Sequence, residues 1–296
     1  MKRHEFIRNA LFGTGWLAAA VASLQTVSAN RNVRKYQQQP DAGSPESNLI
    51  NHTKINSMAN SVLHPADSRG DANHGWLHSK HTFSFSDYFN PERMQFGALR
   101  VLNDDIVNAA MGFGRHPHNN MEIISIPLEG ELEHKDSMGN VAVIRKGDIQ
   151  VMSAGTGVEH SEHNKSLDKP VKFLQIWVFP NKQNVTPRYD QISLNPADRK
   201  NTLQQILSPD PNDAGVWIHQ DAWFHLADFD KGTETQYTFN KNGNGLYVFV
   251  LDGDILVEEQ ALHTRDGFGI WNTNQVYIKA QSNAEFLLME VPMQGY

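Results

Sequence analysis

Two pairs of side chains in the middle of the chain have the types and the spacing of metal ligands. His116 and His118 stand two positions apart in GRHPHNN, as do His160 and Glu162 in VEHSEHN. In a β-strand, residues i and i+2 point to the same face. If two neighbouring strands aim these pairs inward, three imidazoles and one carboxylate converge, a donor set that suits Fe(II), Ni, Cu, Mn or Zn. We therefore expect a metal site with open positions for a substrate and oxygen.

The segments around these pairs are typical of β-strands. Pro117 cannot donate a backbone hydrogen bond, so we expect the two histidines beside it at a strand start, an edge or a bulge. Short segments rich in β-branched and aromatic residues, such as VKFLQIWVFP and AEFLLMEVP, recur along the chain and predict an all-β sandwich or barrel. Helical periodicity is weak, and only residues 196–207 (PADRKNTLQQIL) are expected to form a helix or turn.

One turn pattern occurs twice. LEGELE around Gly130 and LDGDILVE around Gly253 each join an apolar strand, an acidic-glycine turn and a second strand. We interpret each as a β-hairpin. Their separation of 253 − 130 = 123 positions predicts two similar β-domains in tandem.

Composition narrows the function classes. The chain has 296 residues, no cysteine and a net charge of −7. Disulfides, thiolate metal sites and cysteine nucleophiles are excluded. The sequence has no long basic block, which argues against nucleic acid as a partner. We expect a monomer.

The N-terminus has the features of an export signal. Residues 1–29 combine a basic start, an apolar stretch and small residues before a cleavage point, which predicts a signal peptide and a periplasmic protein without stable membrane insertion after cleavage. RHEFIR resembles a twin-arginine signal in which His4 takes the place of the second arginine. If this signal is not functional, the protein stays in the cytoplasm. Residues 30–61 are polar and predict a linker.

Several motifs together resemble a known family. His116-x-His118-x3-Glu122 followed by Gly130 resembles the first cupin motif, and residues 147–164 resemble the second. HPADSRGDANHGWLHSKHTFSFSDYF, FGALRVLNDD, HPHNNMEIISIPLEGELEHKDSMGN and SAGTGVEHSEHN are together similar to the pirin family, and most closely to its bacterial branch described as quercetin 2,3-dioxygenases. The resemblance is dense over residues 64–180.

The resemblance implies a fold and a ligand set. It implies a bicupin of two jelly-roll β-barrels with a few short helices, divided into a metal-binding cupin over residues 62–180 and a C-terminal cupin without metal over 181–296. The implied metal ligands are His116, His118, His160 and Glu162. In most cupins a first-motif carboxylate near the position of Glu122 binds the metal, so Glu122 is the competing fourth ligand, and a one-residue change of spacing decides which face it occupies.

The resemblance also implies an activity. One divalent transition metal, Fe(II) first and Ni, Cu, Mn or Zn as alternatives, is expected to bind a flavonol such as quercetin through its 3-hydroxyl. Glu162 is the expected catalytic base. O2 opens the ring and CO leaves. The expected apolar wall consists of Phe113, Met121, Met152 and Ile124.

Two other functions stay open. A pirin-like protein can use its metal for redox sensing or regulation without turnover, and a cupin isomerase can act without oxygen. Export favours an enzyme over a transcriptional regulator. Among the other histidines, we expect His134 near a hairpin end to be solvated.

Overall fold

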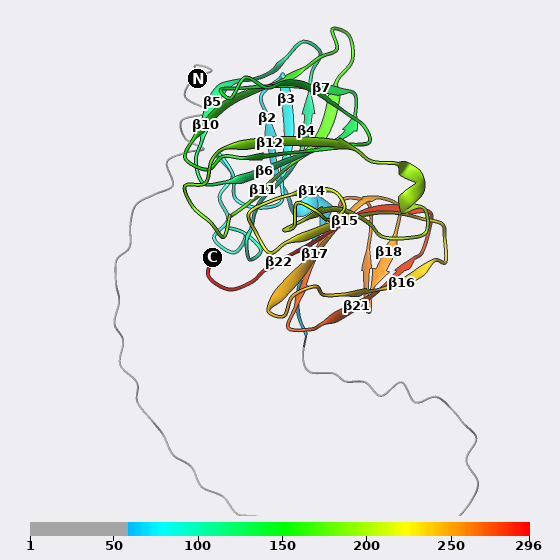
Figure 1. The fold of residues 1–296 in the computed structure, drawn as a ribbon. Coiled ribbons are helices and arrows are strands. Elements are labelled where there is room, and N and C mark those ends of the chain that lie inside the picture. Colours follow the sequence, from blue (N-terminus) through cyan, green and yellow to red (C-terminus); the bar gives the residue numbers. More distant parts are fainter. Residues whose placement is uncertain (1–58) are drawn as a thin grey trace, which may run out of the picture. The chain divides into compact units, whose positions relative to one another are not determined.

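The computed structural model describes residues 59–296, and the expected signal peptide and most of the expected linker lie outside them. The described residues form 22 strands and two 3-10 helices, η1 (Ala66–Ser68) and η2 (Pro196–Arg199). The predicted all-β, two-barrel architecture is confirmed (Figure 1). No helix among these residues has the length and apolar character needed to cross a membrane.

The first barrel combines a seven-stranded and a four-stranded sheet. The larger sheet has the order β12-β9-β6-β11-β4-β3-β2 and the smaller one β5-β10-β7-β8. The strands of the larger sheet are β2 (Gly70–Asn73), β3 (Leu77–His81), β4 (Leu99–Val107), β6 (Glu122–Glu129), β9 (Asp148–Ser153), β11 (Val171–Val178) and β12 (Arg188–Ser193). Those of the smaller sheet are β5 (Gly112–His118), β7 (Glu131–Asp136), β8 (Val141–Arg145) and β10 (Val158–Asn164).

The second barrel repeats this plan. Its sheets have the orders β1-β20-β17-β22-β15-β13-β14 and β16-β21-β18-β19. The larger sheet contains β1 (Asn60–His64), β13 (Gln204–Ser208), β14 (Val216–Trp217), β15 (Trp223–Phe229), β17 (Asn244–Asp252), β20 (Gly267–Trp271) and β22 (Ala284–Pro292). The smaller sheet contains β16 (Glu234–Thr238), β18 (Ile255–Val257), β19 (Gln260–Leu262) and β21 (Gln275–Ala280).

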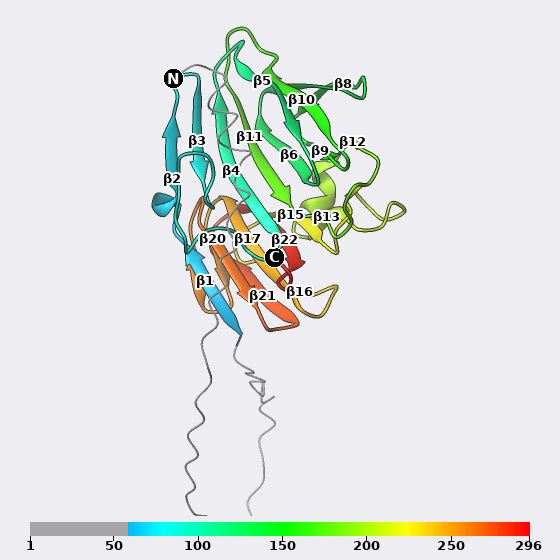
Figure 2. The ribbon, with the colours of Figure 1, turned by 90° about the vertical axis from the view of Figure 1, so that its left-hand side faces the viewer.

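Two edge strands cross the expected domain boundary at residue 180. Strand β1 comes before the first barrel in the sequence but pairs antiparallel with β20 of the second barrel, and Figure 2 shows the two side by side. Strand β12 follows residue 180 but pairs with β9 of the first barrel. Asn60 and Ser61, which we placed in the linker, belong to β1. Each barrel therefore contains an edge strand from the other barrel's part of the sequence, and the backbone hydrogen bonds of β1 and β12 join the two barrels in addition to side-chain packing.

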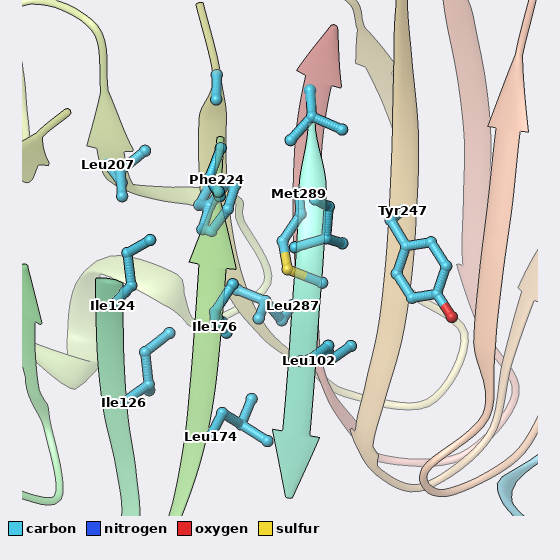
Figure 3. Close-up of a cluster of buried hydrophobic side chains, with 14 of the residues drawn as sticks. Leu102, Ile124, Ile126, Leu174, Ile176, Leu207, Phe224, Tyr247, Leu287 and Met289 are labelled. Carbon is cyan, nitrogen blue, oxygen red and sulfur yellow. The ribbon is translucent and has the colours of Figure 1, made fainter. Parts of the chain in front are cut away.

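The two seven-stranded sheets pack face to face through one hydrophobic core. Figure 3 shows side chains of β4, β6 and β11 meeting those of β15 and β22, among them Ile124, Ile176 and Phe224. These three side chains are fully buried. In β11, alternate residues enter this core, and the residues between them, including Phe173, face the interior of the first barrel. The large sheet of the first barrel is therefore covered on both faces, and its strand β11 (VKFLQIWV) is accordingly apolar at most positions.

The repeated turn is a corner between sheets and not a hairpin, so that part of the prediction is wrong. Strands β6 and β7 flank Gly130 but belong to different sheets, as do β17 and β18 around Gly253. Both glycines have φ of +81°, a conformation that side-chain-bearing residues rarely adopt. At Gly253 an added Cβ would also overlap the carbonyl oxygen of Asn283. The tandem repeat itself is present as the same corner in each barrel.

The expected helix over 196–207 is limited to its first turn. Helix η2 begins where the Asn195 side chain accepts a hydrogen bond from the Ala197 amide, and it ends at Arg199. From Gln204 the chain is strand β13, because Ile206 and Leu207 are buried in the core between the sheets. Pairing with β15 thus prevails over local helical preference.

Candidate metal centre

Three histidines gather inside the first barrel. One ring nitrogen from each of His116, His118 and His160 lies within 4.8 Å of the corresponding atoms of the other two. His116 and His160 are direct register partners on β5 and β10. The Nε2 atoms of His118 and His160 are 3.0 Å apart. The two sequence-predicted pairs therefore do come from neighbouring strands, and their imidazoles converge.

Local sequence explains how β5 presents its two histidines. It is an edge strand of the four-stranded sheet. Pro117 has no backbone N–H to donate, and an edge strand tolerates this because one of its sides has no partner strand. The register with β10 shifts between His160 and Glu162, which form pairs with His116 and Phe113 respectively. The extra residue in β5 is a bulge, and it allows Phe113 and His116 to face the barrel although three positions separate them.

The three imidazoles are neutral and available as ligands. Burial lowers the pKa of His116, holds that of His118 at about 3 and lowers that of His160 well below its usual value. His116 Nδ1 lies 2.8 Å from the Gly114 carbonyl oxygen, which can only accept, so Nδ1 carries the proton and Nε2 keeps a free lone pair. Neutral imidazoles are the form that binds metals.

His134 lies directly behind His160, and our expectation that it would be solvated is wrong. It is fully buried because its strand β7 pairs with β10, which turns the side chain into the barrel. Its Nε2 donates to Asp136 Oδ2 over 3.1 Å, and its Nδ1 is 3.5 Å from His160 Nδ1. The carboxylate can only accept, so this chain places a proton on His160 Nδ1 and frees Nε2 for a metal.

Glu162 lies deeper in the barrel and is not part of the three-histidine group. It is fully buried, and its two carboxylate oxygens accept hydrogen bonds from Ser125 Oγ at 3.1 Å and Gln175 Nε2 at 3.2 Å. Burial raises its pKa to about 7. A second buried acid, Asp105, accepts a hydrogen bond from Ser79 Oγ, and burial likewise raises its pKa to about 7. The sequence does not single out Asp105, since nothing in its local pattern distinguishes it from a surface acid.

Glu122 occupies the opposite face of the large sheet. Strand β6 alternates, so Ile123 and Ser125 face the barrel interior while Ile124 joins the core between the two barrels. Glu122 shares the face of Ile124 and accepts a 2.6 Å hydrogen bond from Ser153 Oγ. Its side chain therefore points away from the histidines.

The apolar wall has three of its four expected members. Phe113 packs in the cluster around Leu132, and Met121 and Met152 pack beside Val158, all within the first barrel. Ile124 is an incorrect assignment, because strand alternation turns it into the core between the barrels.

The donor set fits a divalent transition metal. Three neutral imidazole nitrogens within ligand reach of one another, with a buried carboxyl group farther along β10, are typical of nitrogen and oxygen sites for such ions. A hollow of about 510 Å³ opens beside His118 and is large enough for a small molecule. It is lined by Pro117, His118, Asn119, Ser137, Gly157, Val158 and Glu159. The arrangement can bind a metal next to a space that a substrate can reach.

Comparisons with known proteins agree with this geometry. Residues 62–178 match the Pirin family profile, and residues 205–291 match one described as the quercetinase C-terminal cupin domain. The chain is 41% identical over 230 residues to a quercetin 2,3-dioxygenase of Escherichia coli strain K12, covering 78% of this chain and 98% of that protein. It is 37% identical over 227 residues to a pirin-like protein of Caulobacter vibrioides, covering 76% and 97%.

A solved structure is similar over the same region. The crystal structure of a bacterial pirin from Escherichia coli in complex with nickel(II) is matched with a TM-score of 0.74 and 40% identity. The match covers 78% of this chain and 99% of that one.

Proposed function

Because the chain belongs to the pirin family, we propose that it is a metal-dependent dioxygenase that opens a flavonol such as quercetin with O2 and releases CO. The observation that carries this proposal is the convergence of three neutral imidazoles on one point inside the first barrel, beside a hollow that admits a small molecule. The relative named quercetin 2,3-dioxygenase supports the choice of substrate class.

In this proposal, different residues of the chain bind the metal and transfer the proton. His116, His118 and His160 would hold the ion, which would lower the pKa of a coordinated hydroxyl. Glu162 is the group that receives the proton of the flavonol 3-hydroxyl. Burial gives Glu162 a pKa of about 7, which suits a group that takes up and returns a proton near neutral pH. Ser125 and Gln175 hold its two oxygens in place.

For the metal, we propose a single iron(II) ion, with nickel(II) as the first alternative. Imidazole and carboxylate donors accept either ion. A similar bacterial pirin binds nickel(II). Elemental analysis of the purified protein, followed by turnover measurements after reconstitution with iron(II), nickel(II) or zinc(II), tests the assignment. Higher turnover with nickel(II) or zinc(II) than with iron(II) would refute it.

We also propose that residues 1–29 direct export to the periplasm, by the twin-arginine route, and are then removed. The basic start, the apolar stretch and the small residues around Val27-Ser28-Ala29 support this. Mass spectrometry of the protein from a periplasmic extract should give a mass that begins near Asn30. Recovery of the intact 296-residue chain from the cytoplasm would contradict the proposal.

Oxygen consumption and CO release with quercetin test the activity directly. The reconstituted wild type should consume O2 and release CO in equal amounts under air, and quercetin should persist under argon. Conversion under argon would indicate an isomerase. Metal binding without any conversion under air would favour a sensing or regulatory role.

The two buried glutamates of the first barrel provide a matched pair of variants. Glu162→Gln preserves the shape of the side chain but removes its proton acceptor, so turnover should fall at least 100-fold, the usual contribution of a general base. Glu122→Gln makes the same chemical change on the opposite face of the large sheet, which faces the second barrel, and should retain wild-type turnover and metal content. If both variants keep activity, Glu162 is not the base.

A further inference from the structure

One region of the first barrel contains most of the buried polar atoms that lack a hydrogen-bond partner in the described residues. Nine buried side-chain nitrogen or oxygen atoms in residues 59–296 lack a hydrogen bond. Five of the nine belong to β3 with the loop that follows it, to β4 and to β11: His81 Nδ1, Thr82 Oγ1, Ser86 Oγ, Asn103 Oδ1 and Trp177 Nε1. Each such atom costs free energy unless something else pairs with it, so a cluster of them points to a ligand or to ordered water.

Four polar side chains form a row across the seven-stranded sheet of the first barrel, on the face that lines the barrel interior. His81, Asn103, Gln175 and Ser125 are successive register partners on β3, β4, β11 and β6. Gln175 and Ser125 donate to Glu162. The other two members, His81 and Asn103, are only 2% and 1% exposed and keep unpartnered atoms. The row therefore continues past Glu162 with unused hydrogen-bonding capacity.

This row is connected to the metal centre by aromatic contacts. The Trp177 ring stands edge-on to the His118 ring, with centroids 4.9 Å apart. Phe85 bridges the gap, because its ring lies 5.4 Å from Trp177 and 5.2 Å from His81. Trp177 follows Gln175 by two positions in β11 and so shares its face. The unpartnered Trp177 Nε1 is thus adjacent to a proposed metal ligand.

We propose that His81, Asn103 and Trp177, which lie inside the first barrel on the side of His118 away from the hollow, form a hydrogen-bonding wall that takes the hydroxyl and carbonyl groups on the edge of a planar polyhydroxylated aromatic compound held at the histidine cluster. This inference rests on the proposed function and adds the residues that recognise the substrate. Trp177 can only donate, whereas a neutral histidine and an asparagine can each donate and accept. A phenol can also do both, and a ring carbonyl can accept, so the wall matches this class of compound. Phe85 and the Trp177 ring supply apolar contact for its rings.

Apolar replacements separate ligand recognition from a structural role. Trp177→Phe removes the N–H and keeps a ring against His118, and Asn103→Leu removes the amide at nearly constant size. If the polar atoms serve a ligand, Asn103→Leu should unfold at the wild-type temperature or above it, since an unsatisfied buried group has been removed. If ordered water makes these atoms part of the fold, Asn103→Leu should unfold at a lower temperature. Trp177→Phe also removes part of a packed ring, which lowers the unfolding temperature in either case, so this variant is judged by quercetin binding and metal content.

The experiment is a titration of the metal-reconstituted full-length protein with quercetin under argon, followed by flavonol absorbance. We expect each variant to bind quercetin about tenfold more weakly than wild type, the effect of one lost hydrogen bond. Metal content should not change. Trp271→Phe, on β20 of the second barrel, is the matched control and should bind quercetin as wild type does.

The outcomes are distinguishable. Weaker binding by both variants with unchanged metal content, and an unchanged or higher unfolding temperature of Asn103→Leu, supports the wall. Wild-type affinity in both variants refutes the wall and leaves the proposed function intact. Loss of metal in both variants, or a lower unfolding temperature of Asn103→Leu, shows a structural role and also refutes the wall. Failure of the wild type itself to bind quercetin refutes the proposed function, and the wall with it.

Discussion

Replacing Glu122 by glutamine should raise the stability of the protein at alkaline pH and leave it little changed at acidic pH. Glu122 is 1% exposed, and burial raises its pKa from 4.5 to about 7. The hydrogen bond from Ser153, the positive charge of Arg188 and the backbone amide of His219 oppose this shift without cancelling it. Glutamine keeps the size and an acceptor oxygen but has no titratable proton.

The magnitude follows from the two pKa values. Raising the pKa from 4.5 to about 7 in the folded state is equivalent to about 3 kcal/mol, since each pH unit is worth about 1.4 kcal/mol. The folded protein binds this proton more tightly than the unfolded chain. Its contribution is therefore complete below pH 4.5 and is lost as the pH rises through about 7. Between pH 5 and pH 8 the variant should gain about 2–3 kcal/mol relative to wild type.

Urea unfolding of the metal-free proteins at pH 5, 6, 7 and 8 measures this difference. Any constant effect of the amide cancels, because the prediction concerns only how the difference between variant and wild type changes with pH. Parallel stability profiles would refute the reasoning and show that Glu122 titrates near its ordinary pKa. Metal content is the accompanying check: since Glu122 faces away from the histidines, its loss should leave the metal in place.

Three further predictions concern the site and the packing. Asp136→Asn should weaken metal binding at least about tenfold in a chelator competition, because the carboxylate orients the histidine behind the cluster. Gly97→Ala should cost more than about 2 kcal/mol in urea unfolding, since φ is +53° and an added Cβ would overlap the Pro292 carbonyl. Gly75→Ala is the control, with φ of +81° and open space around the added Cβ, and should cost only about 1 kcal/mol. Equal costs would contradict this reasoning. Phe224→Ala should cost about 3–5 kcal/mol by opening a cavity between the two large sheets, and a loss below 1 kcal/mol would mean that the sheets do not depend on this contact.

Much of the site could be predicted from local sequence. The spacing of two between His116 and His118, and between His160 and Glu162, correctly predicts that each pair shares a face of one strand. Pro117 correctly predicts an edge strand, and the register with β10 adds a bulge. These features depend on neighbours one or two residues away, and the chain carries that information directly.

Other features depend on partners far away in the sequence. Local sequence predicts hairpins at the two glycine corners, because an apolar strand, an acidic-glycine turn and a second strand have the same local pattern whether the strands pair or separate into different sheets. Local sequence predicts a solvated His134, and only its pairing opposite Glu162 reveals that it is buried. Asp105 and the row from His81 to Ser125 become visible only when the register of four strands is known.

The sequence by itself determined the fold class, the family and the side chains that share a face within each strand, because a period of two residues is a local property of the backbone. Only the tertiary structure decided which faces meet. It turned Glu122 toward the second barrel and Glu162 into the first, and it exchanged β1 and β12 between the barrels. The physical reason is that burying both faces of a large sheet is a property of the whole assembly. A shift of one residue in the register of β6 would turn Glu122 into the first barrel, and the same shift in β10 would turn Glu162 out of it.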